Sequence, residues 1–526
     1  MVRKLVRMFM VLALVAGLFG ISGEFGHAEP NPQSGQTQRY FPWVPYGEVI
    51  SDPRGFPDSG PYYGLITVQN LESEQIRIFA FPVGAEVFTQ AVSDFILGPG
   101  ESRSYLPGSI FGEAAPLSSG ILVNAIKTAD DSPARISAVM RQVSATIPDQ
   151  AHETTGAQIT VSGYTSLSYA GIAASPRVVP IAQTNSNWNT LIRVTNFEPQ
   201  DTAFVTMTLR PHGNGNWEQL PSVNIPAGQT HTLNMLDVVP EGWIGSVNIT
   251  SGSHVGAVAE RVKNETNMLM INTSRSAVQT NQVQVAPLVF RNWNHWNTGI
   301  SIVNLDSLPN DITVTYYSPE GGTVHVDEIT IPGWDMDFIY MPAGQGQPFV
   351  GSAAIEGEST FIATVDEVKY FGEDGDTGHA MSYHADYLQA GPGQSLAIPL
   401  FRKGDPQTGG GDTSGVQIFN LFGQAAVRIR VIDSTGQSAL SEPLVINLGP
   451  HEGYTFYSME RDDLPIDFTG SVIIQNLPLE DQNSAVFAVS NLVNYDVQFD
   501  GSSAFNTRWY VTPPTEIAPP PVIIMP

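Results

Sequence analysis

Two short motifs in the chain place a tryptophan among asparagine and threonine, the residue types of a sugar-binding surface. They occupy residues 187–190 and 295–298, and a further tryptophan stands just before the second. A flat ring can cover the apolar face of a sugar while neighbouring amides bond its hydroxyl groups. The alternative is that each tryptophan packs inside its own domain with its N–H bonded to a loop carbonyl. The candidate carbohydrate-binding residues are Trp188, Asn189, Trp293, Trp296 and Asn297.

Acidic side chains gather in two stretches with the composition of loops, 373–376 and 460–463. Loop carboxylates are natural ligands of calcium, the one cofactor for which the chain offers candidates. Neither stretch has the spacing of an EF-hand, and solvated charged turns are the alternative. A zinc site at His379, His384 and Asp386 is not favoured, because His379 lies an odd number of positions from the other two and would face the opposite side of a strand. The candidate calcium ligands are Asp374, Asp376, Asp462 and Asp463.

The sequence lacks the local motifs of the common enzyme classes. It contains no Gly-x-Ser-x-Gly elbow, no phosphate-binding glycine loop and no His-Glu-x-x-His helix. We therefore expect a protein that is not an enzyme. A pair of carboxylates for glycoside hydrolysis stays open as an alternative, because its two members can lie far apart in the chain.

A repeated pattern supplies the elements that must position these residues. A run of alternating apolar and polar residues that ends in asparagine occurs four times, at intervals of roughly 110–125 residues, and a second β-rich run follows each. In the second copy, Ile192 and Val194 alternate with polar residues, which predicts a strand with one buried face in an antiparallel sheet. The asparagine amide can bond nearby backbone and tolerate a left-handed conformation, so we interpret it as a structural strand end. The asparagines are Asn70, Asn196, Asn304 and Asn420, and the second runs are 76–81, 203–209, 312–317 and 426–432.

The spacing of these runs predicts the architecture. Short strands separated by Gly, Pro, Asn and Asp over roughly 110 residues are typical of a β-sandwich, most simply an immunoglobulin-like one. We predict an all-β chain of four tandem antiparallel β-sandwich domains in an elongated array, in which neighbours touch mainly end to end. The first domain carries an insertion around 149–163. The predicted order is a signal peptide at 1–28, a flexible leader at 29–39, domains at 40–173, 174–281, 282–392 and 393–512, and a Pro-rich tail at 513–526.

The start and the composition of the chain indicate its compartment. The first 28 residues have the layout of a bacterial Sec-type signal, with basic residues at 3–7, an apolar run at 8–21 and small residues at Gly26 and Ala28. The apolar run is shorter than the roughly 20 residues that span a membrane, and no later segment is long and apolar enough to do so. The chain has no cysteine, and its net charge of −27 argues against a nucleic-acid partner. We expect a secreted protein, extracellular or at the cell surface.

With its signal-like start, asparagine-ended strands and four copies of one unit, the chain resembles exported bacterial proteins made of tandem immunoglobulin-like β-sandwich repeats. The resemblance covers roughly residues 40–511 and is one of architecture, so no functional residue is carried over from it. It implies a surface-layer, adhesin or matrix protein. We therefore expect an extracellular structural or adhesion protein.

The partners that this expectation implies are other surface or matrix proteins, further copies of the chain, or cell-surface glycans. For self-association, the tail stretch 522–525 is a candidate strand donor. The alternative function is carbohydrate binding through the Trp-Asn-Thr motifs, and after it polysaccharide hydrolysis.

Overall fold

The computed structural model consists almost entirely of β-strands. Its described residues are 37–48, 61–83, 93–106, 118–144, 159–169, 171–173, 176–213, 215–263, 268–278, 280–341, 347–371, 377–405, 410–479, 483–494 and 501–511. Across them, 35 strands are accompanied by two 3-10 helices, η2 (Met235–Asp237) and η3 (Ser458–Glu460). The prediction of an all-β chain is confirmed. Nowhere in these ranges is there a helix with the length and apolar character of a membrane span.

The strands fall into four consecutive sets, which we call units 1 to 4 (residues 38–167, 176–277, 280–386 and 394–511). Unit 1 contains β1 (Gln38–Val44), β2 (Tyr46–Glu48), β3 (Tyr62–Asn70), β4 (Ile76–Pro82), β5 (Ser93–Leu97), β6 (Ser102–Tyr105), β7 (Ser119–Lys127), β8 (Ile136–Ser144) and β9 (Ile159–Thr165). Unit 2 contains β10 (Arg177–Gln183), β11 (Trp188–Asn196), β12 (Ala203–Pro211), β13 (Glu218–Gln219), β14 (Val223–Ile225), β15 (Thr230–Asn234), β16 (Ile244–Ser251), β17 (Val255–Lys263), β18 (Leu269–Thr273) and β19 (Arg275–Ser276).

Units 3 and 4 contain the corresponding strands. Unit 3 consists of β20 (Asn281–Trp293), β21 (Trp296–Asn304), β22 (Asn310–Tyr317), β23 (Thr323–Ile331), β24 (Met336–Tyr340), β25 (Phe349–Phe371) and β26 (Thr377–His384). Unit 4 consists of β27 (Gln394–Asp405), β28 (Gly410–Asn420), β29 (Ala425–Asp433), β30 (Leu444–Leu448), β31 (Gly453–Tyr457), β32 (Phe468–Leu477), β33 (Val486–Val493), β34 (Ser502–Asn506) and β35 (Arg508–Val511).

Each unit has the same two layers. The outer layer has the strand order β5-β4-β7-β1 in unit 1, and the same order recurs as β14-β12-β16-β10, β23-β22-β25-β20 and β30-β29-β32-β27. The inner layer has the order β6-β3-β8-β9, which recurs as β15-β11-β17-β18, β24-β21-β25-β26 and β31-β28-β33-β34. The long strand β25 belongs to both layers of unit 3, because its first half pairs with β22 and its second half with β21.

Apolar side chains between the two layers form the core of each unit. In unit 2, Ile192 and Val194 of the inner layer pack with Val205 and Val247 of the outer layer, and all four are fully buried or nearly so. The other three units have equivalent clusters. This burial is the main stabilising contribution that the alternating pattern predicts, at about 1.5–3 kcal/mol for each fully buried large aliphatic side chain.

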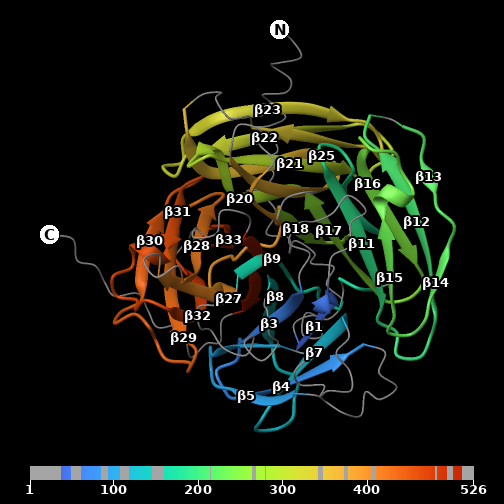
Figure 1. Cartoon of the computed structure of the whole chain (residues 1–526). Helices are drawn as coiled ribbons and strands as arrows, with labels where there is room; N and C mark the ends of the chain where they lie inside the picture. The colour runs from blue at the N-terminus through green and yellow to red at the C-terminus, as the bar shows by residue number, and fades with distance from the viewer. Residues whose placement is uncertain are drawn as a thin grey trace.

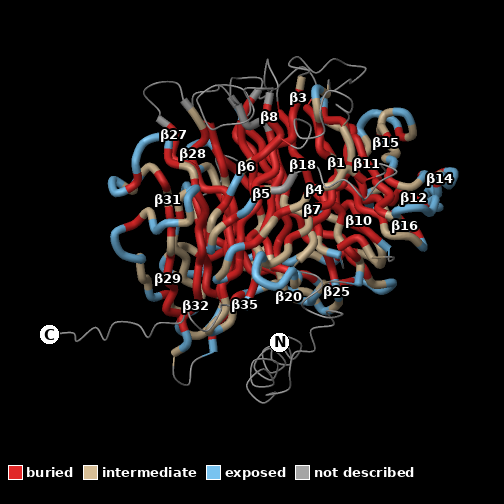
Figure 2. Tube along the Cα trace, turned by 90° about the horizontal axis from the view of Figure 1, so that it is seen from below, coloured by how far each residue is buried: buried red, intermediate tan, exposed pale blue. Residues whose placement is uncertain are grey.

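The four units surround one axis and form a closed, compact body (Figure 1). The inner-layer strands that come last in each unit lie at the centre, where β9 contacts β34 and β18, and β26 contacts the same two strands. Buried apolar clusters join unit 1 to unit 2, unit 2 to unit 3, unit 3 to unit 4 and unit 4 back to unit 1. The prediction of an elongated array is therefore wrong. In the view of Figure 2, buried residues fill the middle of this body and exposed residues lie at its periphery.

The central strands are the elements that the sequence analysis did not identify. The predicted insertion around 149–163 overlaps β9, which is the last inner-layer strand of unit 1 and not an insertion. After each such strand the chain crosses to the outer layer and pairs with the first strand of its own unit. This crossing ties the two layers of each unit together at the end where the central strands stop. The crossing pairs are Leu167 with Tyr40, β19 with β10, Asp386 with Val285, and β35 with β27.

Candidate functional site: the junctions between the units

The inner layers face one another, and buried charged side chains lie where they meet. Arg141, Arg193, Glu260, Arg261 and Asp366 are each less than a tenth exposed. Burying a charge is costly unless it is paired and hydrogen-bonded, so the partners of these groups decide how the units fit together.

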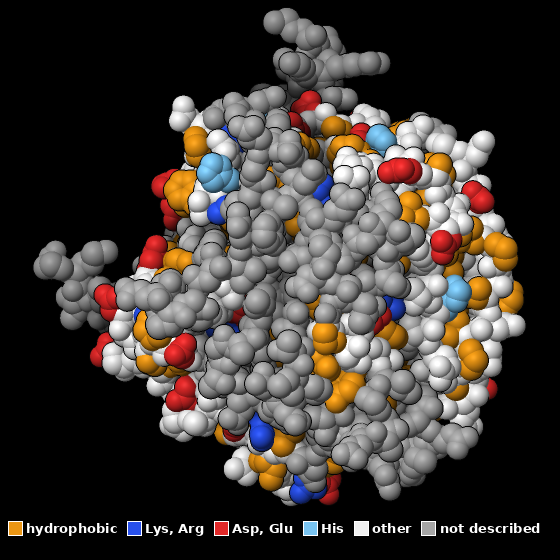
Figure 3. Space-filling model, in the orientation of Figure 1, with side chains coloured by type: hydrophobic (Ala, Val, Ile, Leu, Met, Phe, Trp, Pro, Cys, Tyr) orange, Lys and Arg blue, Asp and Glu red, His pale blue; other side chains and the backbone are white. Residues whose placement is uncertain are grey.

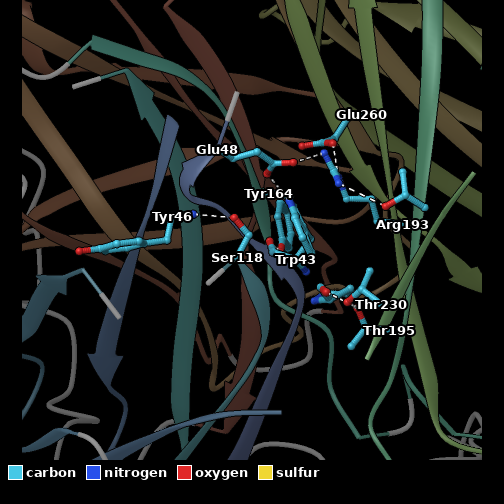
Figure 4. Close-up of polar contacts among 11 residues, drawn as sticks. Trp43, Tyr46, Glu48, Ser118, Tyr164, Arg193, Thr195, Thr230 and Glu260 are labelled. Atoms are coloured by element: carbon cyan, nitrogen blue, oxygen red, sulfur yellow. Dashed lines mark hydrogen bonds and ion pairs between the residues drawn. The ribbon is translucent and has the colours of Figure 1, made fainter. Parts of the chain in front are cut away.

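At the junction of units 1 and 2, one guanidinium lies between two carboxylates (Figure 4). Arg193 on β11 donates from Nε to Glu260 Oε2 on β17, and from Nη2 to Glu48 Oε1 on β2 of unit 1, both at 2.5 Å. The Trp43 ring of β1 lies 4.3 Å from the guanidinium, a cation–π distance, and its Nε1 donates to Glu48 Oε2 at 2.8 Å. Burial raises the pKa of Glu48 to about 7, and the neighbouring Glu260 carboxylate adds to that rise.

Hydrogen bonds to backbone hold the rest of this junction. The hydroxyl of Tyr164 on β9 donates to Trp43 O at 2.5 Å, which fixes the strand that carries the ring. Thr195 Oγ1 of β11 donates to Pro42 O of β1 and also lies 2.7 Å from Thr230 Oγ1. A link from β11 to β1 therefore crosses from unit 2 to unit 1 without any charge.

The junctions of unit 2 with unit 3 and of unit 4 with unit 1 each contain a buried ion pair. Arg261 on β17 donates to both carboxylate oxygens of Asp366 on β25, at 2.6 and 2.5 Å. Arg141 on β8 donates to Asp412 Oδ2 on β28 at 2.9 Å, and Arg402 donates to the same oxygen at 3.0 Å. Burial and the charge of Arg402 lower the pKa of Arg141 to about 10. Two guanidinium groups thus share one fully buried carboxylate.

Aromatic rings form the junction of units 3 and 4, whereas the other three junctions contain buried charged side chains. Tyr317 at the end of β22 stacks on His451, with the ring centroids 4.3 Å apart, and Phe419 lies 5.8 Å from Tyr317. Burial lowers the pKa of His451, which favours the neutral ring in this stack. Gly453 N donates to Pro319 O at 2.9 Å across the junction.

The last residues of the four central strands are joined by hydrogen bonds that pass through all four units. Thr165 Oγ1 of β9 donates to Asn506 O of β34 at 3.1 Å. The Asn506 amide bonds the backbone of His384 on β26 twice, with Nδ2 donating to O at 2.7 Å and Oδ1 accepting from N at 3.1 Å. His384 Nε2 lies 2.8 Å from Thr273 O of β18. These four residues occupy equivalent places, because each pairs with the fourth residue of the neighbouring inner strand, counted from the residue opposite the strand-end asparagine.

The histidine in this chain of bonds is neutral. Burial, followed by the positive charge of Arg275, holds the pKa of His384 well below its ordinary value. Its Nε2–H then donates to Thr273 O, while Nδ1 accepts from Thr364 Oγ1 at 3.1 Å. A neutral ring with both nitrogens bonded holds units 2 and 3 together without placing an unpaired charge on the axis.

The tryptophans singled out from the sequence lie in different environments. Trp188 is 4% exposed and packs between units 2 and 3, and Trp296 is 2% exposed and stacks on His379. Neither ring has an open face for a sugar. Trp293 is 49% exposed.

The amides beside these tryptophans bond protein groups. Asn189 Nδ2 donates to Asn234 Oδ1 at 2.9 Å, and Asn297 Oδ1 accepts from Asn292 N at 2.9 Å. Both amides therefore hold local structure.

The structure describes two of the four candidate calcium ligands. Asp374 and Asp376 lie outside the described residues. Asp462 and Asp463 are exposed in a turn, where Asp463 pairs with Arg461 at 2.5 Å. Among the residues that the structure does describe, no group of three His, Cys, Asp or Glu side chains could hold a metal ion.

The four strand-end asparagines are fully buried and make one repeated set of hydrogen bonds. Asn304 is representative: Nδ2 donates to Leu308 O at 2.7 Å and to Pro332 O at 3.0 Å, and Oδ1 accepts from Asp306 N at 2.9 Å. The amide thus fastens the loop after its own strand to the turn that follows an outer edge strand. None of the four is among the described residues with a positive φ, so these asparagines act through their amide bonds and do not use the left-handed conformation that asparagine tolerates. Asn70 and Asn196 make the corresponding bonds in units 1 and 2. Asn420 keeps the two donated bonds, to Gly423 O and Gly449 O, but its Oδ1 accepts from Ala485 N, which precedes β33.

Sequence reasoning missed the charged groups at the junctions. Glu260 and Arg261 stand in the middle of the apolar run 255–262, where each charge interrupts a strand that is buried on both faces. Such an interruption was the available signal, because charged residues are almost never fully buried unless they are paired.

The comparisons with known proteins do not assign a family. No family model matches the chain, and no curated protein matches it. Among solved structures, the chain shows a likeness to a tetra-tandem repeat in the extending region of a large adhesion protein. The identity is 10%, the match covers 88% of this chain and 98% of that chain, and the TM-score is 0.10. A TM-score this low supports no conclusion about the arrangement or the function of this chain.

Proposed function

We propose that the chain is an exported structural or adhesion protein in which four immunoglobulin-like units form one rigid body. The observation that carries the proposal is the closed set of junctions, each with a buried apolar cluster and three of them with buried ion pairs or charge networks. The signal-like segment at 1–28 supports export to the cell surface or beyond. The proposal assigns no enzymatic activity to the chain.

The mechanism would be multivalent display. Units fixed around one axis hold the loops between their strands at constant separations. Several weak contacts with a target surface therefore act together once the first has formed. A flexible string of the same units would lose part of that gain, because each further contact would have to order a linker. Partners are other surface or matrix proteins, further copies of the chain, or cell-surface glycans.

The experiment compares cells of the source bacterium with a strain that lacks the gene. The chain should be recovered outside the cytoplasm, and its intact mass should equal that of a chain that begins at Glu29. The deletion strain should attach to surfaces or to other cells less well, and purified mature chain added from outside should restore attachment. Recovery only from the cytoplasm with residues 1–28 in place would overturn export. Unchanged attachment and matrix in the deletion strain would overturn the adhesive and structural role.

A further inference from the structure

Exposed aromatic rings gather where the end of β12 in unit 2 meets β24 in unit 3. Trp217 is 52% exposed, Phe338 42% and Tyr340 49%. Most exposed apolar side chains of a protein stand singly, and on the face drawn in Figure 3 they are scattered among polar and charged groups. A group of exposed rings around shared polar partners differs from such isolated side chains and suggests a binding function.

The first half of this surface is a guanidinium held between two indole rings. The guanidinium carbon of Arg210 lies 4.4 Å from the centroid of Trp217 and 5.1 Å from that of Trp334. Arg210 Nη1 also donates to Trp334 O at 3.4 Å, which links β12 of unit 2 to unit 3. Arg210 is only 8% exposed, so it fixes the two rings more than it presents a charge.

The backbone of Trp334 has an unusual conformation in this position. Its φ is 60°, in the left-handed region that a bulky residue rarely adopts. The strained conformation is held by Trp334 N, which donates to Asp306 O at 2.8 Å, and by the turn at Gly333, where a Cβ would lie 2.0 Å from Ser307 O. The equivalent turn residues of the other units, Gly100, Gly228 and His451, also have a positive φ, so the turn common to all units fixes the place of the Trp334 ring.

The second half of the surface continues along β24. The ring of His212 lies 5.3 Å from Phe338, and its Nε2 lies 3.2 Å from Asp337 Oδ1. Phe338 and Tyr340 are two positions apart on one strand, so their rings point to the same side about 7 Å apart. Tyr340 pairs with Gly299, which has no side chain to cover the ring.

From this arrangement we propose that the surface formed by Trp217, Trp334, Phe338 and Tyr340 binds a carbohydrate. The rings would cover the apolar C–H faces of successive sugar residues, while His212, Asp337 and the Tyr340 hydroxyl bond hydroxyl groups. A nucleic acid is disfavoured by the net charge of −27. A protein partner fits less well, because half-exposed rings separated by polar groups leave no continuous apolar area for it to bury. The inference rests on the proposed function to the extent that an exported adhesive protein meets glycans.

The site differs from the Trp-Asn-Thr motifs, and the chain supplies a matched control for it. Trp293 belongs to those motifs, is 49% exposed, and has none of the contacts described above. The experiment measures binding of the purified full-length mature chain to soluble starch, xylan, galactomannan, dextran and alginate, by titration calorimetry and by tryptophan fluorescence. The variants are Trp217→Ala, Tyr340→Ala, Tyr340→Phe and Trp293→Ala.

At least one polysaccharide should bind, and Trp217→Ala and Tyr340→Ala should each weaken that binding about tenfold or more. Tyr340→Phe should keep most of the affinity, because the ring remains, and Trp293→Ala should keep all of it. The melting temperatures should stay within about 2 °C of the wild type, since these side chains are half exposed.

Absence of binding to every polysaccharide overturns the site, and so does equal binding by all four variants. Loss of binding in Trp293→Ala alone would place the sugar at the Trp-Asn-Thr motifs. The measurement uses purified protein, so a chain found only in the cytoplasm would overturn the proposed function and leave this result standing.

Discussion

Replacing Asp366 by Asn tests whether the buried ion pairs hold the units together. Asp366 and Arg261 bond through two parallel contacts, and the guanidinium side chain is 1% exposed. Asp366→Asn keeps the shape of the side chain but removes the carboxylate charge, so the buried guanidinium keeps one amide oxygen and the Ser382 hydroxyl at 3.2 Å as neutral partners. Removing one member of a buried pair costs about 3–5 kcal/mol. We expect a loss of about 4 kcal/mol.

The size of the shift in melting temperature shows whether the four units unfold together or separately. An unfolding entropy of about 2.1 cal/mol/K per residue over roughly 475 residues is about 1 kcal/mol/K, so 4 kcal/mol lowers the melting temperature by about 4 °C if the body unfolds as one. If units 2 and 3 unfold separately, roughly 210 residues respond and the shift is about 9 °C. Calorimetry and guanidinium titration on the same samples distinguish the two cases.

Two further variants decide what such a shift means. The exposed pair of Arg461 and Asp463 has the same chemistry, with side chains 26% and 37% exposed, and Asp463→Asn should cost less than about 1 kcal/mol. The double variant R261M/D366L removes both buried charges, so it should cost less than D366N alone. A loss in D366N no larger than in D463N, or a double variant as unstable as D366N, would refute the reasoning.

Three other expectations follow from the fold and the junctions. X-ray scattering of the mature chain should give a radius of gyration of about 23 Å, the value for a compact body of this length. A rod of four units, each roughly 35 Å long, would give roughly 40 Å. Asn304→Ala should lower the free energy of unfolding by about 2–4 kcal/mol in guanidinium titration, because it leaves three loop backbone groups without their partner; a loss below 1 kcal/mol would contradict the fastening role. Because the pKa of Glu48 rises from 4.5 to about 7 on folding, the folded chain holds that proton more tightly, and its stability should fall by up to about 3 kcal/mol as the pH rises from 4.5 to above 7. Melting temperatures at pH 5 and pH 8 should therefore change less in Glu48→Gln than in the wild type, and an equal change in both proteins would count against this assignment.

The strands that alternate cleanly were predictable from the sequence. The asparagine-ended runs and the runs that follow them correspond to β3, β11, β21 and β28 and to β4, β12, β22 and β29. Their residues face a core on one side, so the periodicity of two is visible in the sequence. The asparagines end their strands as predicted, because one amide can satisfy several loop backbone groups at once.

The central strands were not predictable in the same way, because packing around an axis removes that periodicity. β34 contains the small residues Ser502, Ser503 and Ala504, and β9 contains Gly163, where a Cβ would lie 2.8 Å from the Phe505 ring of unit 4. Small residues allow the central strands to approach one another closely, and in a sequence such residues are more typical of loops than of strands. The Trp-Asn-Thr motifs left two interpretations open, and the burial of Trp188 and Trp296 agrees with the packing role for these two rings.

Equivalent positions carry different charges, and this difference favours one order of the units around the axis. Counted from the residue opposite each strand-end asparagine, the sixth residue of the inner strand is Arg141 in unit 1, Glu260 in unit 2, Asp366 in unit 3 and Asn491 in unit 4. Four identical units would place like charges at every junction, which costs free energy when the groups are buried. In this structure Arg141 forms an ion pair with Asp412 of unit 4, and Asp366 forms one with Arg261 of unit 2. Exchanging two units would leave these charges without partners, so the pairs favour the observed order over the alternatives as well as stabilising it.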